Sequence, residues 1–195
     1  QWFRYTGDLV RFVLERPMAA DPGATFTYNG GLTNVLGEAV RRASGLRLDR
    51  FSETYLFATL AISDFSWYLI RPDLVYASGD VSLRPRDLAK LGRLYLQGGL
   101  WEGVRVLSPE WVAASAAPVF VMQPWPGCAG YSYGWWPRTA IYGSGAYAAE
   151  GWGGQALIVM PELDAVVVFT GGSYWTSPRL SPHQMMEAYV LPAFR

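Results

Sequence analysis

The chain has 195 residues, of which 16 are basic and 16 are acidic, so its formal net charge at pH 7 is zero. A balanced charge without a run of basic residues argues against a surface that binds nucleic acid or anionic membranes. A single cysteine, Cys128, excludes an internal disulfide, and a single histidine, His183, excludes a zinc site built from several histidines and cysteines.

Hydrophobic residues make up 51% of the chain, enough for the core of one domain. No apolar run reaches the roughly 18 residues of a membrane span. The first residues do not combine a basic end, an apolar run and a small-residue cleavage site, as a secretory leader would. We therefore expect one domain over residues 1–195, with no membrane span and with neither a metal nor another cofactor.

The N-terminal part, residues 1–117, is predicted to be a mostly helical lobe. Apolar side chains recur at helical spacing in 8–16, 31–44 and 48–57. Gly45 is placed to end the second of these helices. That helix is expected to turn one apolar face inward, formed by Leu32, Val35, Leu36, Ala39 and Val40.

Two further helices are predicted from the residues at their ends. Pro85 suits the first turn of a helix that Gly98 and Gly99 would stop. Ser108 is a good N-cap for another helix, with Pro109 at its first position.

The second part, residues 118–195, is predicted to contain antiparallel strands and a C-terminal helix over 181–191. A short connection should join the last two strands as a hairpin. Helices followed by an antiparallel sheet indicate an α+β fold rather than alternating β–α–β units. The expected strands are 131–136, 155–160 and 164–170, which are rich in β-branched and aromatic residues.

Two motifs resemble known sites but lie in the wrong context. Residues 130–134 read G-x-S-x-G around Ser132, and Asp164 and His183 follow in the order that α/β-hydrolases use. A nucleophile elbow requires a strand before the serine and a helix after it, whereas this segment is predicted to be a loop entering a strand. Residues 143–148 read G-x-G-x-x-A without the flanking strand and helix of a dinucleotide site, so a glycine-rich loop is the better interpretation.

The lone His183 is interpreted as a solvent-facing or core-edge residue, and Cys128 as a small loop residue, rather than as catalytic groups. Tyr28 is a stronger candidate for catalysis. It precedes a predicted helix directly, where the field of the helix N-terminus acts on a phenol and a nearby hydroxyl could exchange a proton with it.

Residues 22–45, which read PGATFTYNGGLTNVLGEAVRRASG, resemble the second conserved block of the β-lactamase-related serine hydrolases. This family includes class C β-lactamases, D-alanyl-D-alanine peptidases, carboxylesterases and amide hydrolases that act on short oligomers. In that block a Tyr-x-Asn triplet precedes a helix, and here Tyr28, Asn29 and Gly30 occupy the triplet. Five further segments resemble family blocks in the family's order: 56–62, 78–92, 98–112, 131–136 and 150–172.

The resemblance implies a β-lactamase/transpeptidase-like fold and a mechanism. In the family, the serine of a Ser-x-x-Lys motif attacks a carbonyl, while the lysine and the Tyr-x-Asn tyrosine shuttle the proton. An edge strand carrying Lys-Thr-Gly or His-x-Gly supplies one N–H of the oxyanion hole. Tyr28 is accordingly the residue expected to be catalytic.

The chain departs from the family pattern at the nucleophile. It has no Ser-x-x-Lys motif, because its one lysine, Lys90, has Asp87 three residues before it. In the family that motif lies before the Tyr-x-Asn block, hence upstream of Gln1. We therefore expect this sequence to be the C-terminal portion of a serine acyl hydrolase and to be inactive as given.

Two other departures bear on substrate. Gly30 stands where the family's asparagine orients substrate, which disfavours β-lactams. The strand triplet has neither Lys nor His and could be 149–151 or 151–153, so Gly151, Trp152 and Gly153 are the candidate substrate contacts. Esters or neutral amides are thus expected as substrates ahead of β-lactam-like compounds, with Trp135, Trp136 and Trp152 as a candidate lining for an apolar acyl group.

Two alternatives remain open. The chain could be a non-catalytic binding or regulatory module of the same fold, or an esterase of the α/β-hydrolase type that uses Ser132. The expected partner is a small molecule rather than a nucleic acid. The sequence does not fix the compartment, and the resemblance is compatible with a periplasmic or secreted location.

Overall fold

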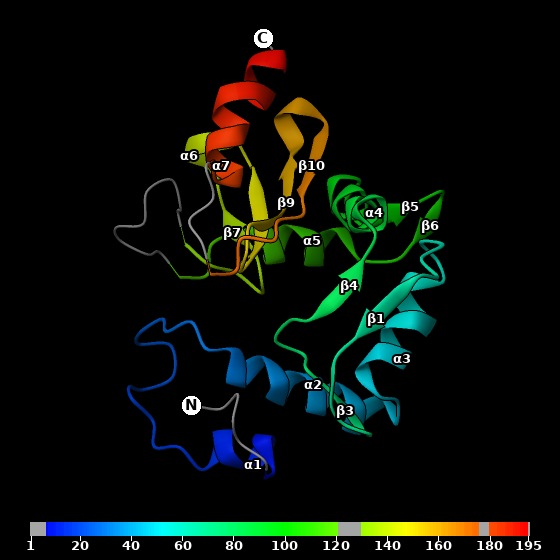
Figure 1. Ribbon diagram of the computed structural model, residues 1–195, viewed down its shortest axis with the longest axis vertical. Helices are drawn as coiled ribbons and strands as arrows, with labels where there is room; N and C mark the ends of the chain where they lie inside the picture. The colour runs from blue at the N-terminus through cyan, green and yellow to red at the C-terminus, as the bar shows by residue number, and fades with distance from the viewer. Residues whose placement is uncertain (1–6, 121–129, 176–179, 195) are drawn as a thin grey trace. The chain divides into compact units, whose positions relative to one another are not determined.

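The computed structural model describes residues 7–120, 130–175 and 180–194, and it divides the chain into two compact units. Unit 1 comprises Gln1–Leu83 and unit 2 comprises Arg84–Arg195 (Figure 1). Helices and antiparallel strands occur as predicted for an α+β chain. The expectation of a single domain, with a change of character after residue 117, stays a prediction.

Unit 1 contains the three helices expected from the sequence, together with short strands that the sequence did not predict. Strands of two or three residues are too short for an alternating pattern to reveal them. The helices are α1 Leu9–Leu14, α2 Gly30–Ser44 and α3 Leu48–Ser52, the last continued by a π-helical turn Glu53–Phe57. The strands form two antiparallel pairs, β1 Phe65–Trp67 with β4 Val81–Leu83 and β2 Leu69–Arg71 with β3 Leu74–Val75.

The predicted inward face of α2 is wrong. Leu32 is 53% exposed and Leu36 is 66% exposed. The helix instead lies so close to Ala77 that a Cβ on Gly37 would come within 2.7 Å of the alanine Cβ. Such a close approach requires a small residue, so small and polar side chains occupy the buried face. These residues are Gly31, Asn34, Gly37 and Glu38.

Glu38 is a buried carboxylate held by Arg41 and Arg42 of the same helix. Arg41 donates from Nε and Nη2 at 2.7 and 2.8 Å, and Arg42 donates from Nε at 2.7 Å. The hydrogen bonds from Arg41 are the largest cause that lowers the pKa of Glu38 to about 2, against the opposing effect of burial.

Replacing Glu38 by Gln is expected to lower the free energy of unfolding at pH 7 by about 1–2 kcal/mol, because both arginines lose their anionic partner. A carboxyl whose pKa is depressed by folding stabilises the native state above its unfolded pKa. The difference between wild type and variant should therefore shrink as pH falls from about 4.5 to about 2. Urea titrations across this range measure it, and a difference that does not change with pH would contradict the assignment.

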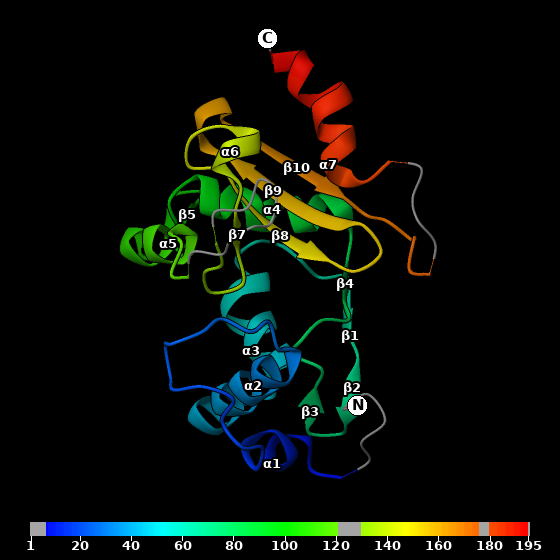
Figure 2. The same cartoon turned by 90° about the vertical axis from the view of Figure 1, so that its left-hand side faces the viewer.

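In the part of unit 2 that the structure describes, a four-stranded antiparallel sheet carries helices on both faces (Figures 1 and 2). Helix α4 packs Leu88, Leu91 and Tyr95 on one face. The C-terminal helical segment, which comprises α7, a π-helical turn Met186–Val190 and a 3-10 turn Leu191–Phe194, packs Met186 on the other. The strand order is β10–β9–β8–β7, with β7 Trp136–Pro137, β8 Tyr147–Gly151, β9 Gln155–Met160 and β10 Ala165–Phe169. The main helices are α4 Pro85–Leu96, α5 Pro109–Ala116, α6 Thr139–Tyr142 and α7 Pro182–Met185, and a small hairpin pairs β5 Leu100–Trp101 with β6 Val104–Arg105.

The hairpin of the last two strands is confirmed, because β9 and β10 pair antiparallel around the short turn that the sequence predicted. The strand predicted over 131–136 is wrong. Ser132 and Trp135 exchange backbone hydrogen bonds at 2.9 and 2.7 Å, which closes a tight turn. Gly134 in this turn has φ +97°, a conformation that favours glycine. Composition did not predict strand β8, because Tyr147 and Ala148 at its start were read as part of a glycine-rich loop, whereas the family resemblance had placed an edge-strand triplet at 149–151 or 151–153.

Among the described residues, no helix combines the length and apolar character that crossing a membrane requires. The same residues contain no group of three or more His, Cys, Asp or Glu side chains placed to hold a metal ion.

Candidate active site

Tyr28 lies immediately before the N-cap of α2. Asn29 is the N-cap, and its Oδ1 accepts a hydrogen bond from Gly31 N at 2.8 Å. An asparagine at this position satisfies one of the unpaired N–H groups of the first turn. The Tyr28 side chain is 60% exposed and so does not lie in a sealed apolar interior.

The segment around Tyr76 packs against α2, the helix that follows Tyr28 and Asn29. Burial raises the pKa of the Tyr76 phenol, and the charges of Asp80 and Tyr28 raise it further against an opposing hydrogen bond with Ser78.

Asn34 fixes the start of α2 against this segment. Its fully buried amide donates to Gly30 O at 3.0 Å and accepts from Ala77 N at 2.9 Å. The candidate Gly30 is thus the first residue of α2, and its carbonyl is occupied by Asn34. Sequence reasoning missed Asn34, although its spacing of three residues from both Gly31 and Gly37 marks a face that can approach another backbone.

The outer edge of β8 can be assigned from its hydrogen-bond register. Arg138 N donates to Ala146 O at 2.7 Å, and β7 pairs Trp136 with Ala148. Backbone groups alternate in direction along a strand, so those of Glu150 point to the same side as those of Ala148. Within the described residues, β7 pairs only with Tyr147 and Ala148 of β8. The backbone of Glu150 therefore faces outward beyond the end of β7.

The predicted substrate contacts follow directly after this edge. Gly151 and Trp152 are exposed at the end of β8, whereas Gly153 is buried beneath Tyr174. Gly153 has φ +83°, and a Cβ there would lie 2.5 Å from Tyr174 Cε1, so only glycine fits.

A charged network ties β8 to the rest of unit 2. Glu150 accepts two hydrogen bonds from Arg138 at 2.8 and 2.7 Å, and its Oε1 lies 3.5 Å from His183 Nε2. The other ring nitrogen of His183 is hydrogen-bonded to the Tyr142 hydroxyl. Burial raises the pKa of Glu150, but the hydrogen bonds with His183 and Arg138 outweigh it and leave the pKa below its ordinary value. Burial also raises the pKa of Tyr142.

The structure does not support a nucleophile elbow at Ser132. The side chain is buried, and its Oγ donates to Ala114 O at 3.2 Å. The turn folds back on itself through Trp135 and leads into the short strand β7 rather than directly into a helix. His183, the proposed triad partner, is bound by Glu150 and Tyr142 instead. Cys128 lies outside the described residues.

Of the three tryptophans expected to line an apolar site, one packs in the core and a second is half-buried. Trp135 is 7% exposed and packs on Tyr147, with ring centroids 5.0 Å apart. Trp136 is half-buried and packs edge-on against Tyr131. Trp152 is the exception, since it is 62% exposed.

The sequence profile of the β-lactamase family matches residues 1–177, which is most of the chain. This chain belongs to the β-lactamase family. The family profile covers both Tyr28 in unit 1 and the edge of β8 in unit 2. A curated relative, the 6-aminohexanoate-dimer hydrolase of Paenarthrobacter ureafaciens, is 32% identical over 165 residues.

Solved structures share the fold of this β-lactamase-family chain. A Bacillus anthracis protein, provisionally assigned as a 6-aminohexanoate-dimer hydrolase, has a TM-score of 0.79 at 21% identity over 95% of this chain and 48% of its own. EstCE1, described as a hydrolase with promiscuous acyltransferase activity, has a TM-score of 0.75 at 17% identity over 91% of this chain and 59% of its own. The alignment with the curated relative covers 78% of this chain but only 40% of that enzyme.

Proposed function

We propose that this chain forms part of a serine acyl hydrolase that cleaves esters or amides through an acyl-enzyme, with Tyr28 in the proton shuttle. The observation that carries the proposal is the position of Tyr28, 60% exposed and directly before the N-cap of α2. The nucleophilic serine and its lysine would come from residues outside this sequence, because the one lysine, Lys90, is not part of a Ser-x-x-Lys motif.

Each residue then has a defined task. The serine hydroxyl loses its proton to the lysine and Tyr28 pair as its oxygen bonds to the substrate carbonyl carbon. The carbonyl oxygen becomes an oxyanion that accepts hydrogen bonds from backbone N–H groups. The oxyanion then collapses and the bond from the carbonyl carbon to the leaving oxygen or nitrogen breaks, while the shuttle gives its proton to that atom, so the alcohol or amine departs and the acyl-enzyme remains. Water then attacks the acyl carbon by the same route, which releases the acid and restores the serine.

The strand register favours 149–151 as the triplet at the substrate edge. These three residues lie within β8, whereas 152–154 form the turn to β9. The backbone of Glu150 faces outward, and continued alternation past Gly151 would direct the N–H of Trp152 to the same side. We infer that Trp152 N–H is the chain's donor to the oxyanion.

The chemistry of this edge supports esters or neutral amides rather than β-lactams. The triplet offers no lysine or histidine to pair with a substrate carboxylate, and Gly30 has no side-chain amide to orient a β-lactam. A relative whose name gives a 6-aminohexanoate dimer as its substrate is consistent with this preference.

The test compares this chain with a longer form that includes its upstream coding residues, assayed on p-nitrophenyl butyrate and nitrocefin. We expect no turnover by this chain, and hydrolysis by the longer form of the ester in preference to nitrocefin. Ester hydrolysis by this chain that disappears in Ser132→Ala would restore the elbow hypothesis. A longer form that carries no Ser-x-x-Lys motif and hydrolyses nothing would favour a non-catalytic module.

A further inference from the structure

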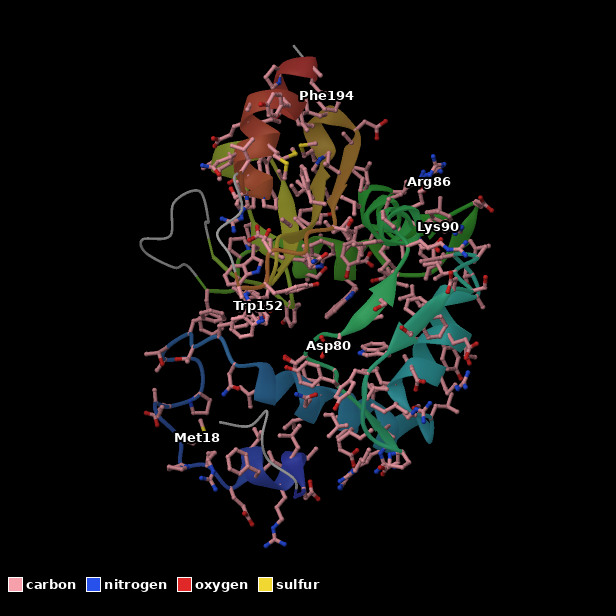
Figure 3. All side chains as sticks on the ribbon, viewed as in Figure 1. Met18, Asp80, Arg86, Lys90, Trp152 and Phe194 are labelled. Carbon is pink, nitrogen blue, oxygen red and sulfur yellow. The ribbon has the colours of Figure 1, made fainter. Side chains whose placement is uncertain are left out.

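Three exposed aromatic rings meet at the turn between β8 and β9. Trp152 is 62% exposed, Tyr174 is 45% exposed and Trp175 is 89% exposed. The Trp152 ring centroid lies 5.5 Å from that of Tyr174 and 4.5 Å from that of Trp175, both in edge-to-face geometry. Figure 3 shows Trp152 at the end of the sheet of unit 2. We call these three residues the aromatic cluster.

The backbone beneath the aromatic cluster is held in place. Ser173 N donates to Gly153 O at 3.1 Å, which joins the turn to the segment after β10. Gln155 Nε2 donates to Gly171 O and to the Tyr174 hydroxyl, the latter at 3.3 Å. Tyr174 occupies the space that a side chain on Gly153 would need. These contacts hold the aromatic cluster in place before a ligand binds, so less conformational entropy is lost on binding.

The aromatic cluster is suited to a neutral apolar ligand. The side chain that hydrogen-bonds the Tyr174 hydroxyl is the uncharged Gln155, and within the described part of the chain no arginine lies over any of the three rings. A cation cage needs ring faces that converge on one vacant point. Here Trp152 meets both neighbouring rings edge-to-face, with interplanar angles of 72° and 87°, so the rings pack on one another instead of facing one vacant point. What they offer a ligand is an outer apolar surface.

An exposed patch of this kind marks a binding surface more often than scattered apolar residues do. Its position indicates which part of a substrate it would meet. Trp152 directly follows Gly151 at the exposed edge of β8, so a group bonded to a carbonyl at that edge would extend over the rings. An unbranched alkyl chain can lie flat against ring faces and remove apolar area from water at every methylene.

We propose that Trp152, Tyr174 and Trp175 bind the unbranched alkyl chain on the acyl side of the substrate. This inference rests on the proposed function for the identity of the substrate, but the binding of an alkyl chain can be measured without catalysis. The aromatic cluster would make the enzyme select linear acyl groups by length.

The binding test uses this chain labelled with 5-fluorotryptophan and observed by ¹⁹F NMR. Trp152→Phe, Trp175→Phe and Trp111→Phe assign three signals; Trp111 is the matched control, because it is 44% exposed and packs on a tyrosine, Tyr133. N-methylhexanamide should shift the Trp152 and Trp175 signals saturably and leave that of Trp111 in place, whereas N-methylacetamide should shift none. Shifts caused by hexyltrimethylammonium but not by the hexanamide would overturn the proposal, as would equal shifts at all three residues.

The catalytic test uses the longer form and p-nitrophenyl esters from acetate to octanoate. The ratio of kcat/KM for octanoate to that for acetate should fall about tenfold or more in Trp175→Ala, because several methylenes lose their contact. Trp111→Ala should leave the ratio unchanged. If kcat/KM depends on acyl-chain length in the same way in Trp175→Ala and in the wild type, the inference about the aromatic cluster fails but the proposed function stands. If no ester is hydrolysed but the ¹⁹F shifts appear, the proposed function fails and the alkyl-binding surface stands.

Discussion

Replacing Tyr28 by Phe in the longer form should lower kcat for p-nitrophenyl butyrate by about 10²–10⁴-fold, the range typical for loss of a positioned proton-transfer group. The change removes only the phenolic hydroxyl. The side chain is 60% exposed, so its removal should leave the thermal unfolding midpoint nearly unchanged. Steady-state kinetics and thermal scans on the same preparations separate an effect on catalysis from an effect on folding.

Tyr55 provides a matched control for this substitution. It is also 60% exposed and lies in unit 1, where its ring packs on Phe51. Tyr55→Phe should retain wild-type kcat and KM. A Tyr28→Phe variant with wild-type kcat would remove the phenol from the mechanism, and with it the residue on which the functional proposal depends.

Breaking the ion pair between Arg138 and Glu150 should have the largest effect on stability. Removing one partner of a buried pair leaves an uncompensated charge and costs about 3–5 kcal/mol. The side chains of Arg138 and Glu150 are 10% and 22% exposed, so we expect Glu150→Ala to lower the free energy of unfolding by about 3 kcal/mol. Guanidinium titrations at pH 7 measure the loss.

The pH dependence of this effect follows from the direction of the Glu150 pKa. Folding depresses that pKa through hydrogen bonds with His183 and Arg138, which exceed the opposing effect of burial. The stabilisation is therefore complete above the unfolded pKa of about 4.3 and is lost as pH falls through the lower native value. The difference between wild type and Glu150→Ala should thus diminish below about pH 4.

An exposed ion pair serves as the comparison. Arg50 and Glu53 lie 2.6 Å apart with side chains 60% and 45% exposed, so Glu53→Ala should cost less than about 1 kcal/mol. Equal losses in Glu53→Ala and Glu150→Ala would show that burial of the Arg138–Glu150 pair contributes nothing to the stability of unit 2.

The sequence was sufficient wherever a local signal defines an element. Gly45 ends α2 with φ +73°, a conformation in which glycine is favoured over other residues. Ser108 caps α5 by accepting from Trp111 N, with Pro109 at the first position as predicted. Ser181 caps α7 and forms a capping box with Gln184. These interactions join residues a few positions apart, so they can be read without knowledge of the fold.

The sequence could not identify surfaces that depend on distant partners. The apolar residues Leu32 and Leu36 suggested the inward face of α2, but the approach of Ala77 selected Gly37 and Asn34 for that face. A periodic pattern reports which residues share a side of a helix, whereas the neighbouring segment decides which side is buried.

The tryptophans of the candidate site also show that the sequence does not decide which residues are buried. Trp135 and Trp152 both lie in segments that contain glycine. Trp135 nevertheless packs in the core, whereas Trp152 is exposed beside Tyr174.

The sequence by itself determined the family, the α+β class, the helix ends and the place of Tyr28 before α2, because each rests on residue order and short-range contacts. The tertiary structure alone decided the register at β8, the network around Glu150 and the grouping of Trp152 with Tyr174 and Trp175. Each of those features brings together segments that are distant in the sequence. Their contacts are determined by the free energy of packing in the folded chain, which residue order alone does not reveal.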